Sequence, residues 1–193
     1  MQIISVNCPN CGAPVPRGSN ECGYCGSRVF VTSFGDVYRM PFGSINAYLT
    51  GCRAAAGEGE LSARHSQGLC CLKLGMYDEA YEAFSEEIRN DFNDSEAYFC
   101  AAAAILRGKK PFLTSRAAID RAENMLRSAC AAETRGIYLY FLAYIRYDYY
   151  ERKRLNVSPS YREYLEAANS VGVSEDDIDL LFKMLTVERP KCI

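Results

Sequence analysis

The sequence lacks several features that common enzyme classes need. Tryptophan is absent and His65 is the only histidine, so the chain has no set of histidines for a metal site or a catalytic triad. It has no glycine-rich loop that would cradle phosphates, no serine in a nucleophile elbow and no prominent carboxylate pair. These absences predict a protein that is not an enzyme.

Long apolar runs and a strong excess of one charge are also missing. No stretch reaches the length of a membrane span, and the first six residues are too short and uncharged for a signal peptide. The net charge of −2 gives no general attraction to phosphates, whereas 49% hydrophobic residues suffice for a packed core. We therefore expect a cytoplasmic protein without a membrane span.

Cysteine, by contrast, is abundant, and four of the ten cysteines form two matched pairs. The pairs read Cys-Pro-Asn-Cys-Gly and Cys-Gly-Tyr-Cys-Gly, with ten residues between them. A Cys-x-x-Cys turn places two thiolates on one side of a tight bend, and two facing turns supply a tetrahedral metal site. The glycine after each pair allows a positive φ, which turns backbone amides toward the sulfurs. The expected ligands are Cys8, Cys11, Cys22 and Cys25.

These knuckles resemble the short zinc ribbon, over roughly residues 3–33. The resemblance implies one structural Zn²⁺ per chain, because four sulfur ligands leave no open position for water or substrate. Iron stays open, since rubredoxin-like sites also use four thiolates. A redox disulfide fits less well, because glycine and strand-like residues follow both pairs instead of a helix. Short strands are expected at residues 3–6 and 28–31.

The other six cysteines do not pair by spacing. Adjacent cysteines on a helix point to different faces, so they chelate a metal poorly. We interpret the six as buried free thiols that behave as small hydrophobic residues. They are Cys52, Cys70, Cys71, Cys100, Cys130 and Cys192.

Beyond the ribbon (1–33), the sequence predicts a linker at residues 34–43 and a helical domain at 44–193, and the helical domain is expected to fold without the ribbon. The fold class is therefore mainly α: a small N-terminal β ribbon plus an irregular array of about eight helices in hairpins. The expected helices cover 45–56 after Ser44, 60–74, 78–90, 95–107, about 115–132, 134–154, 158–171 with Pro159 at its first position, and one from Ser174.

The second and third of these helices resemble a tetratricopeptide repeat. Gly68, Ala80 and Phe84 match its close-packing positions, whereas Arg64 and Glu87 depart from it. The resemblance implies a groove for another protein, lined by first helices of successive pairs. The expected partner-binding residues are Arg64, Gln67, Tyr98 and Arg107. An ordinary helical bundle is the alternative.

Six tyrosines crowd residues 138–150, and one helix face cannot bury them all. Tyr138, Tyr149 and Tyr150 are therefore either partner-binding residues or core residues covered by the last helices.

Taken together, these features favour a non-enzymatic zinc-binding adaptor or scaffold that binds other proteins through its helical domain and possibly its ribbon. The alternative is a nucleic-acid-associated ribbon protein of transcription or translation. Charge argues against that alternative, because only Arg17 and Arg28 are basic within residues 1–33, and four thiolates with one zinc ion add −2. The basic run at 152–154 reads as a solvated helix end.

Overall fold

A computed structural model shows a mainly α fold with a small N-terminal ribbon. The structure describes residues 6–8, 11–16, 19, 21–27, 29–31 and 33–193. The chain divides into two compact units, residues 1–87 and 88–193, and each is described by itself. Within the described residues, no helix combines the length and the apolar character that crossing a bilayer requires.

The ribbon of unit 1 contains a two-stranded antiparallel sheet. Strand β1 (Val6–Asn7) pairs with β2 (Pro14–Val15), with Val6 opposite Val15. Of the first expected strand, Ile3 and Ile4 lie outside the described residues. The second expected strand is not observed: residues 29–31 form bends and an extended segment, and Arg28 lies outside the described residues.

The segment expected to be a linker contains a short helix, α1 (Phe34–Arg39), which begins at Ser33 because the Ser33 hydroxyl accepts from the Asp36 amide. Its last turn is closed by Lys73, whose ammonium donates to the carbonyls of Val37, Tyr38 and Met40 at 2.6–3.2 Å. A lysine at a helix C-terminus satisfies carbonyls that have no partner within the helix. Residues 34–40 are therefore held in place by side-chain contacts.

Three longer helices complete unit 1. They are α2 (Phe42–Gly57), α3 (Leu61–Lys73) and α4 (Tyr77–Asn90), whose last residues run past the unit boundary. Helix α2 begins at Phe42, two residues before the expected cap, and the Ser44 hydroxyl instead donates to the Pro41 carbonyl.

Helices α3 and α4 are in close contact at Gly68. A Cβ atom on Gly68 would lie 2.7 Å from the Phe84 ring, so only glycine fits there without a shift. The two departures from the repeat pattern make ionic contacts between the same helices: Arg64 pairs with Glu86, and His65 Nδ1 lies 2.9 Å from Glu87 Oε2. The contact geometry expected of Gly68 and Phe84 is present, and the wider likeness to a tetratricopeptide repeat stays a prediction.

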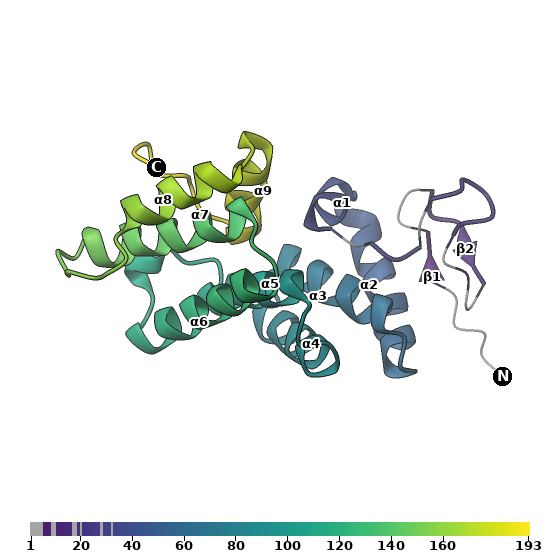
Figure 1. The fold of residues 1–193 in the computed structure, drawn as a ribbon. Helices are drawn as coiled ribbons and strands as arrows, with labels where there is room; N and C mark the ends of the chain where they lie inside the picture. Colours follow the sequence, from purple (N-terminus) through teal and green to yellow (C-terminus); the bar gives the residue numbers. More distant parts are fainter. Residues whose placement is uncertain (1–5, 9–10, 17–18, 20, 28, 32) are drawn as a thin grey trace. The chain divides into compact units, whose positions relative to one another are not determined.

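Unit 2 is built from helices that pack as sequential neighbours. Helix α5 (Ser95–Leu106) lies against α6 (Arg116–Ala132), and α7 (Gly136–Ile145) lies against α8 (Tyr161–Val171), as Figure 1 also shows. Gly136 allows α7 to approach α8, because a Cβ atom there would lie 2.1 Å from the Gly172 carbonyl oxygen. The elements are α5 (Ser95–Leu106), the 3₁₀ turn η1 (Pro111–Leu113), α6 (Arg116–Ala132), α7 (Gly136–Ile145), the π-helix η2 (Arg146–Glu151), α8 (Tyr161–Val171) and α9 (Glu175–Leu185).

Two expected helices differ in detail. The helix expected at 134–154 starts at Gly136 and changes to π geometry at Arg146. The next helix is capped by Ser160, whose capping box with Glu163 replaces the expected start at Pro159.

The tyrosines that could have been either core or partner-binding residues belong to the core. Tyr138, Tyr149 and Tyr150 are all buried.

Candidate metal centre

The two knuckles have the same backbone geometry. Gly12 and Gly26 both take positive φ, 74° and 69°, and each donates its amide to the carbonyl of the first cysteine of its pair at 2.9 and 2.8 Å. The residue after each glycine, Ala13 or Ser27, donates its amide to the sulfur of Cys11 or Cys25. The left-handed glycine therefore turns the following amide toward the sulfur, as the sequence pattern predicts.

All four predicted cysteines come together. Their sulfur atoms lie within 4.8 Å of one another, with Cys8 Sγ to Cys25 Sγ at 3.6 Å and Cys11 Sγ to Cys22 Sγ at 3.7 Å. Four sulfurs about 2.3 Å from one zinc ion would lie about 3.8 Å apart at the corners of a tetrahedron. A disulfide would need about 2.05 Å. The donor set thus fits a tetrahedral zinc ion, and all ten cysteines of the chain are free thiols.

The proximity of the thiols strongly affects their ionisation. The Ala13 amide favours the Cys11 thiolate, but the neighbouring thiols outweigh it and raise the pKa of Cys11 to about 12. Hydrogen bonding with the side chain and backbone of Ser27 lowers the pKa of Cys25 to about 6. Without a metal ion, Cys11 is therefore protonated at neutral pH, and a cation held by the four sulfurs would favour its thiolate form.

The segment after the second knuckle is fixed to the helices of unit 1. The Tyr48 hydroxyl on α2 donates to the Val29 carbonyl at 2.7 Å and accepts from the Val31 amide at 3.1 Å. Ser66 on α3 donates to the Val31 carbonyl at 2.9 Å. Burial raises the pKa of Tyr48, which keeps the hydroxyl protonated. Sequence reasoning missed these two residues, because nothing local to Tyr48 or Ser66 signals a partner about 18 or 35 residues away.

The predicted partner-binding residues are divided between the units, with Arg64 and Gln67 in unit 1 and Tyr98 and Arg107 in unit 2. The Arg64 guanidinium pairs with Glu86 and donates to the Ala56 carbonyl at 3.0 Å, so it stabilises the packing of α2, α3 and α4. Gln67 and Tyr98 are half-buried, and Arg107 is exposed at the C-terminal cap of α5. Whether a partner contacts these side chains stays a prediction.

Most of the other cysteines match the expectation of buried thiols. Cys52, Cys70, Cys71 and Cys100 are buried, Cys130 is half-buried, and Cys192 is exposed, contrary to the expectation. Burial raises the pKa of Cys52 to about 12 and that of Cys71 to about 11. These thiols are therefore protonated and poorly reactive.

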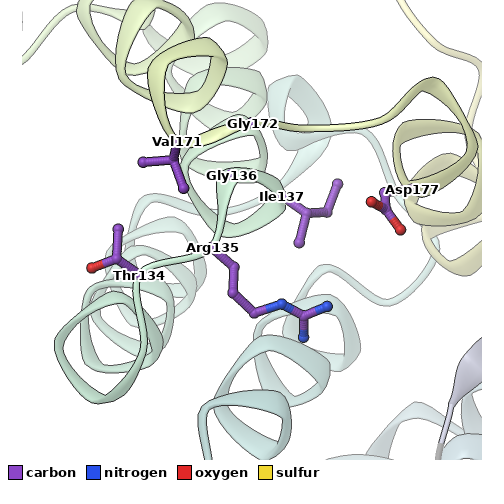
Figure 2. Close-up of a pocket in the computed structure, with 7 residues that line it drawn as sticks. All are labelled: Thr134, Arg135, Gly136, Ile137, Val171, Gly172 and Asp177. Carbon is purple, nitrogen blue, oxygen red and sulfur yellow. The ribbon is translucent and has the colours of Figure 1, made fainter.

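A small open pocket lies in unit 2 where α7 begins and α8 ends (Figure 2). Its two charged side chains already serve the fold: Arg135 bonds Glu96 at 2.8 Å, and Asp177 accepts from the Ser174 hydroxyl at 2.7 Å. Its volume of about 230 Å³ is below the range of typical ligand pockets. The metal centre is thus better supported as a functional site than this pocket.

Comparison with known families agrees with the geometry of the metal centre. Residues 7–29 match the family model of the zinc-ribbon domain. No curated protein and no solved structure matched the chain. The ribbon is thus identified both by its family match and by its four clustered cysteines.

Proposed function

We propose that this protein is a zinc-stabilised, non-enzymatic adaptor that binds other proteins through its helices. The four clustered sulfurs are the observation on which the zinc part of the proposal rests, because two of their separations, 3.6 and 3.7 Å, are close to the separation of about 3.8 Å in a closed tetrahedral site. One zinc ion per chain, held by Cys8, Cys11, Cys22 and Cys25, has a structural role. The sulfur ligands supply a fixed centre from which residues 29–31 reach α2 and α3.

The helical hairpins support the protein-binding part of the proposal. Hairpin arrays present extended surfaces to peptides and helices and seldom catalyse reactions. The six cysteines outside the metal centre, none of them in a disulfide, favour a reducing compartment, and we propose the cytoplasm.

An affinity capture with crosslinking tests the binding proposal. The bait is the zinc-loaded full chain, compared with a variant carrying Gln67→Ala, Tyr98→Ala and Arg107→Asn. Arg64 is left intact because its ion pair with Glu86 stabilises the fold, and asparagine tolerates the left-handed backbone of position 107. We expect the variant to lose a protein partner without losing its zinc or its melting temperature.

Nuclease treatment of the lysate distinguishes the alternative function. A partner that depends on protein contacts survives the treatment. If capture disappears after nuclease treatment and is unaffected by the triple substitution, the protein is nucleic-acid-associated and the adaptor proposal is wrong.

A further inference from the structure

Two basic segments that are far apart in the sequence meet in unit 2. Lys109 and Lys110 precede η1, and Arg152, Lys153 and Arg154 follow η2. The two elements η1 and η2 lie in contact. The sequence alone favours a solvated helix end for residues 152–154. No local pattern in it shows that Lys109 and Lys110 lie beside them.

A buried carboxylate joins the segments. Asp148, in the π-helix, accepts from the Phe112 amide at 2.7 Å and from Arg152 Nη1 at 2.5 Å. The Arg152 guanidinium lies 4.5 Å from the centre of the Phe112 ring. Lys153 lies 5.1 Å from the same ring and 3.7 Å from the centre of the Tyr149 ring. These contacts hold both basic segments around Phe112.

Arg152 and Lys153 contact Asp148, Phe112 and Tyr149, but the other three cations of the surface make no contact among the described residues that offsets their mutual repulsion. The region carries five basic side chains against two carboxylates, Asp148 and Glu151. In the part of the chain that the structure describes, the side chains of Lys109, Lys110 and Arg154 are exposed and make no ion pair. Like charges held together repel one another, and burying Asp148 costs desolvation energy. A negatively charged ligand would explain why the arrangement exists.

The apolar residues of the region indicate which kind of ligand. Leu113, directly after Phe112, has a relative exposure of 70%, and Leu155, directly after Arg154, has 44%. The sugar-phosphate backbone of a nucleic acid is polar and charged, so exposed leucines would gain no apolar contact with it. The rings of Phe112 and Tyr149 already face Arg152 and Lys153, which leaves them poorly placed for stacking on bases. Basic side chains beside exposed aliphatic ones are instead typical of peripheral binding to anionic membranes.

We propose that this basic loop surface, made of Lys109, Lys110, Leu113, Arg152, Lys153 and Arg154, docks reversibly on anionic phospholipid. The lysines and arginines contact the headgroup phosphates, and Leu113 enters the interface between headgroups and acyl chains. The inference goes beyond the adaptor function and does not depend on it, since all six residues lie in unit 2, away from the metal ligands in the sequence.

Vesicle sedimentation tests the proposal with the zinc-loaded full chain. The probes are phosphatidylcholine vesicles with and without phosphatidylserine, at low and at physiological salt. We expect binding only to vesicles that contain phosphatidylserine, and weaker binding as salt increases. Lys109→Glu with Lys110→Glu should lower the partition coefficient on the order of tenfold or more.

Matched variants distinguish an effect of the basic loop surface from an effect of the net charge of the whole protein. Arg39→Glu with Arg89→Glu makes the same change in net charge at exposed sites outside the basic loop surface and should leave binding unchanged. Leu113→Ser should weaken binding several-fold at every salt concentration, because the loss is apolar. Circular dichroism checks that each variant is folded.

Three outcomes would overturn the proposal. The first is that the unaltered protein does not bind phosphatidylserine vesicles at low salt. The second is that the lysine double variant binds as well as the unaltered protein. The third is that the Arg39/Arg89 control loses as much binding as the lysine double variant. Binding of a duplex oligonucleotide or an acidic peptide through the same lysines, without vesicle binding, would also contradict the lipid assignment.

Discussion

At the residue scale, the metal centre depends on four sulfur atoms, two buried and two exposed. Cys8 and Cys22, the first residues of the knuckles, are buried, whereas Cys11 and Cys25 are exposed. The two exposed cysteines shift in opposite directions, because hydrogen bonding with the Ser27 side chain and backbone lowers the pKa of Cys25 whereas the neighbouring thiols raise that of Cys11. Each knuckle thus combines a thiol packed into the ribbon with one that faces solvent.

Replacing one ligand should release the metal. Cys22→Ser removes a sulfur that lies 3.7 Å from that of Cys11, and three thiolates hold zinc far less tightly than four. We expect zinc loss at chelator concentrations that the unaltered protein withstands, measured with a colorimetric zinc indicator. Cys192→Ser is the matched control, because that exposed cysteine is not among the four clustered thiols. Equal zinc retention in the two variants would contradict the assignment of Cys22.

The contact between Gly68 and Phe84 gives a second prediction at this scale. Gly68→Ala places a methyl group 2.7 Å from a fully buried ring, and we expect a loss of about 1–3 kcal/mol in the free energy of unfolding. Gly43→Ala, in open space at the start of α2, should be neutral or stabilise by about 0.5 kcal/mol. Chemical denaturation measures both. A Gly68→Ala variant as stable as the Gly43→Ala variant would refute the close approach of α3 and α4.

At the scale of elements, the ribbon is attached to the helices by residues outside it. The Tyr48 hydroxyl bridges the backbone of residues 29 and 31, and Val29 and Val31 are buried. The sequence predicts that the helices fold without the ribbon, because it gives no sign of this bridge. The bridge instead links metal binding to the packing of α2.

Tyr48→Phe removes the bridge and keeps the ring. It leaves the Val29 carbonyl and the Val31 amide without this partner, which costs about 1–3 kcal/mol when such groups are buried. We expect a lower melting temperature and faster zinc transfer to a chelator. The control is Tyr24→Phe, because Tyr24 in the second knuckle is 81% exposed. If Tyr48→Phe transfers zinc no faster than Tyr24→Phe, the bridge does not support the metal centre.

The elements show what the sequence predicts and what it does not. Knuckles and helix caps depend on residues within a few positions of one another, so the two knuckles whose four cysteines cluster and the cap at Ser174 are predicted correctly. Helix α1 was missed because its end is closed by Lys73, more than thirty residues later. The basic loop surface was missed for the same reason, since Asp148 reaches the Phe112 amide across 36 residues. Contacts of this range have no local signal.

At the scale of the whole molecule, all four proposed zinc ligands lie in one of the two compact units. The ribbon, α1, α2 and α3 belong to unit 1, and the Glu123–Arg146 pair and the buried Tyr138, Tyr149 and Tyr150 belong to unit 2. A structural zinc ion contributes about 10 kcal/mol or more to the folding of a small domain. The two units should therefore respond differently to chelation.

We expect two thermal transitions when zinc is removed. A strong chelator should lower the melting temperature of unit 1 and reduce the helical circular-dichroism signal in part, because α2 and α3 lose the ribbon that covers them. Unit 2 should unfold at an unchanged temperature. Differential scanning calorimetry with and without chelator measures this. A transition that does not move at all, or a complete loss of helix, would contradict the division.

The most direct test of the central claim is the metal content of the protein purified under reducing conditions without added metal. Elemental analysis by mass spectrometry should give close to one zinc ion per chain and no stoichiometric iron, because the four clustered cysteines lie in a segment that matches the zinc-ribbon family model. A chain that carries iron in place of zinc, or that is metal-free with its four ribbon cysteines reduced, would contradict the account.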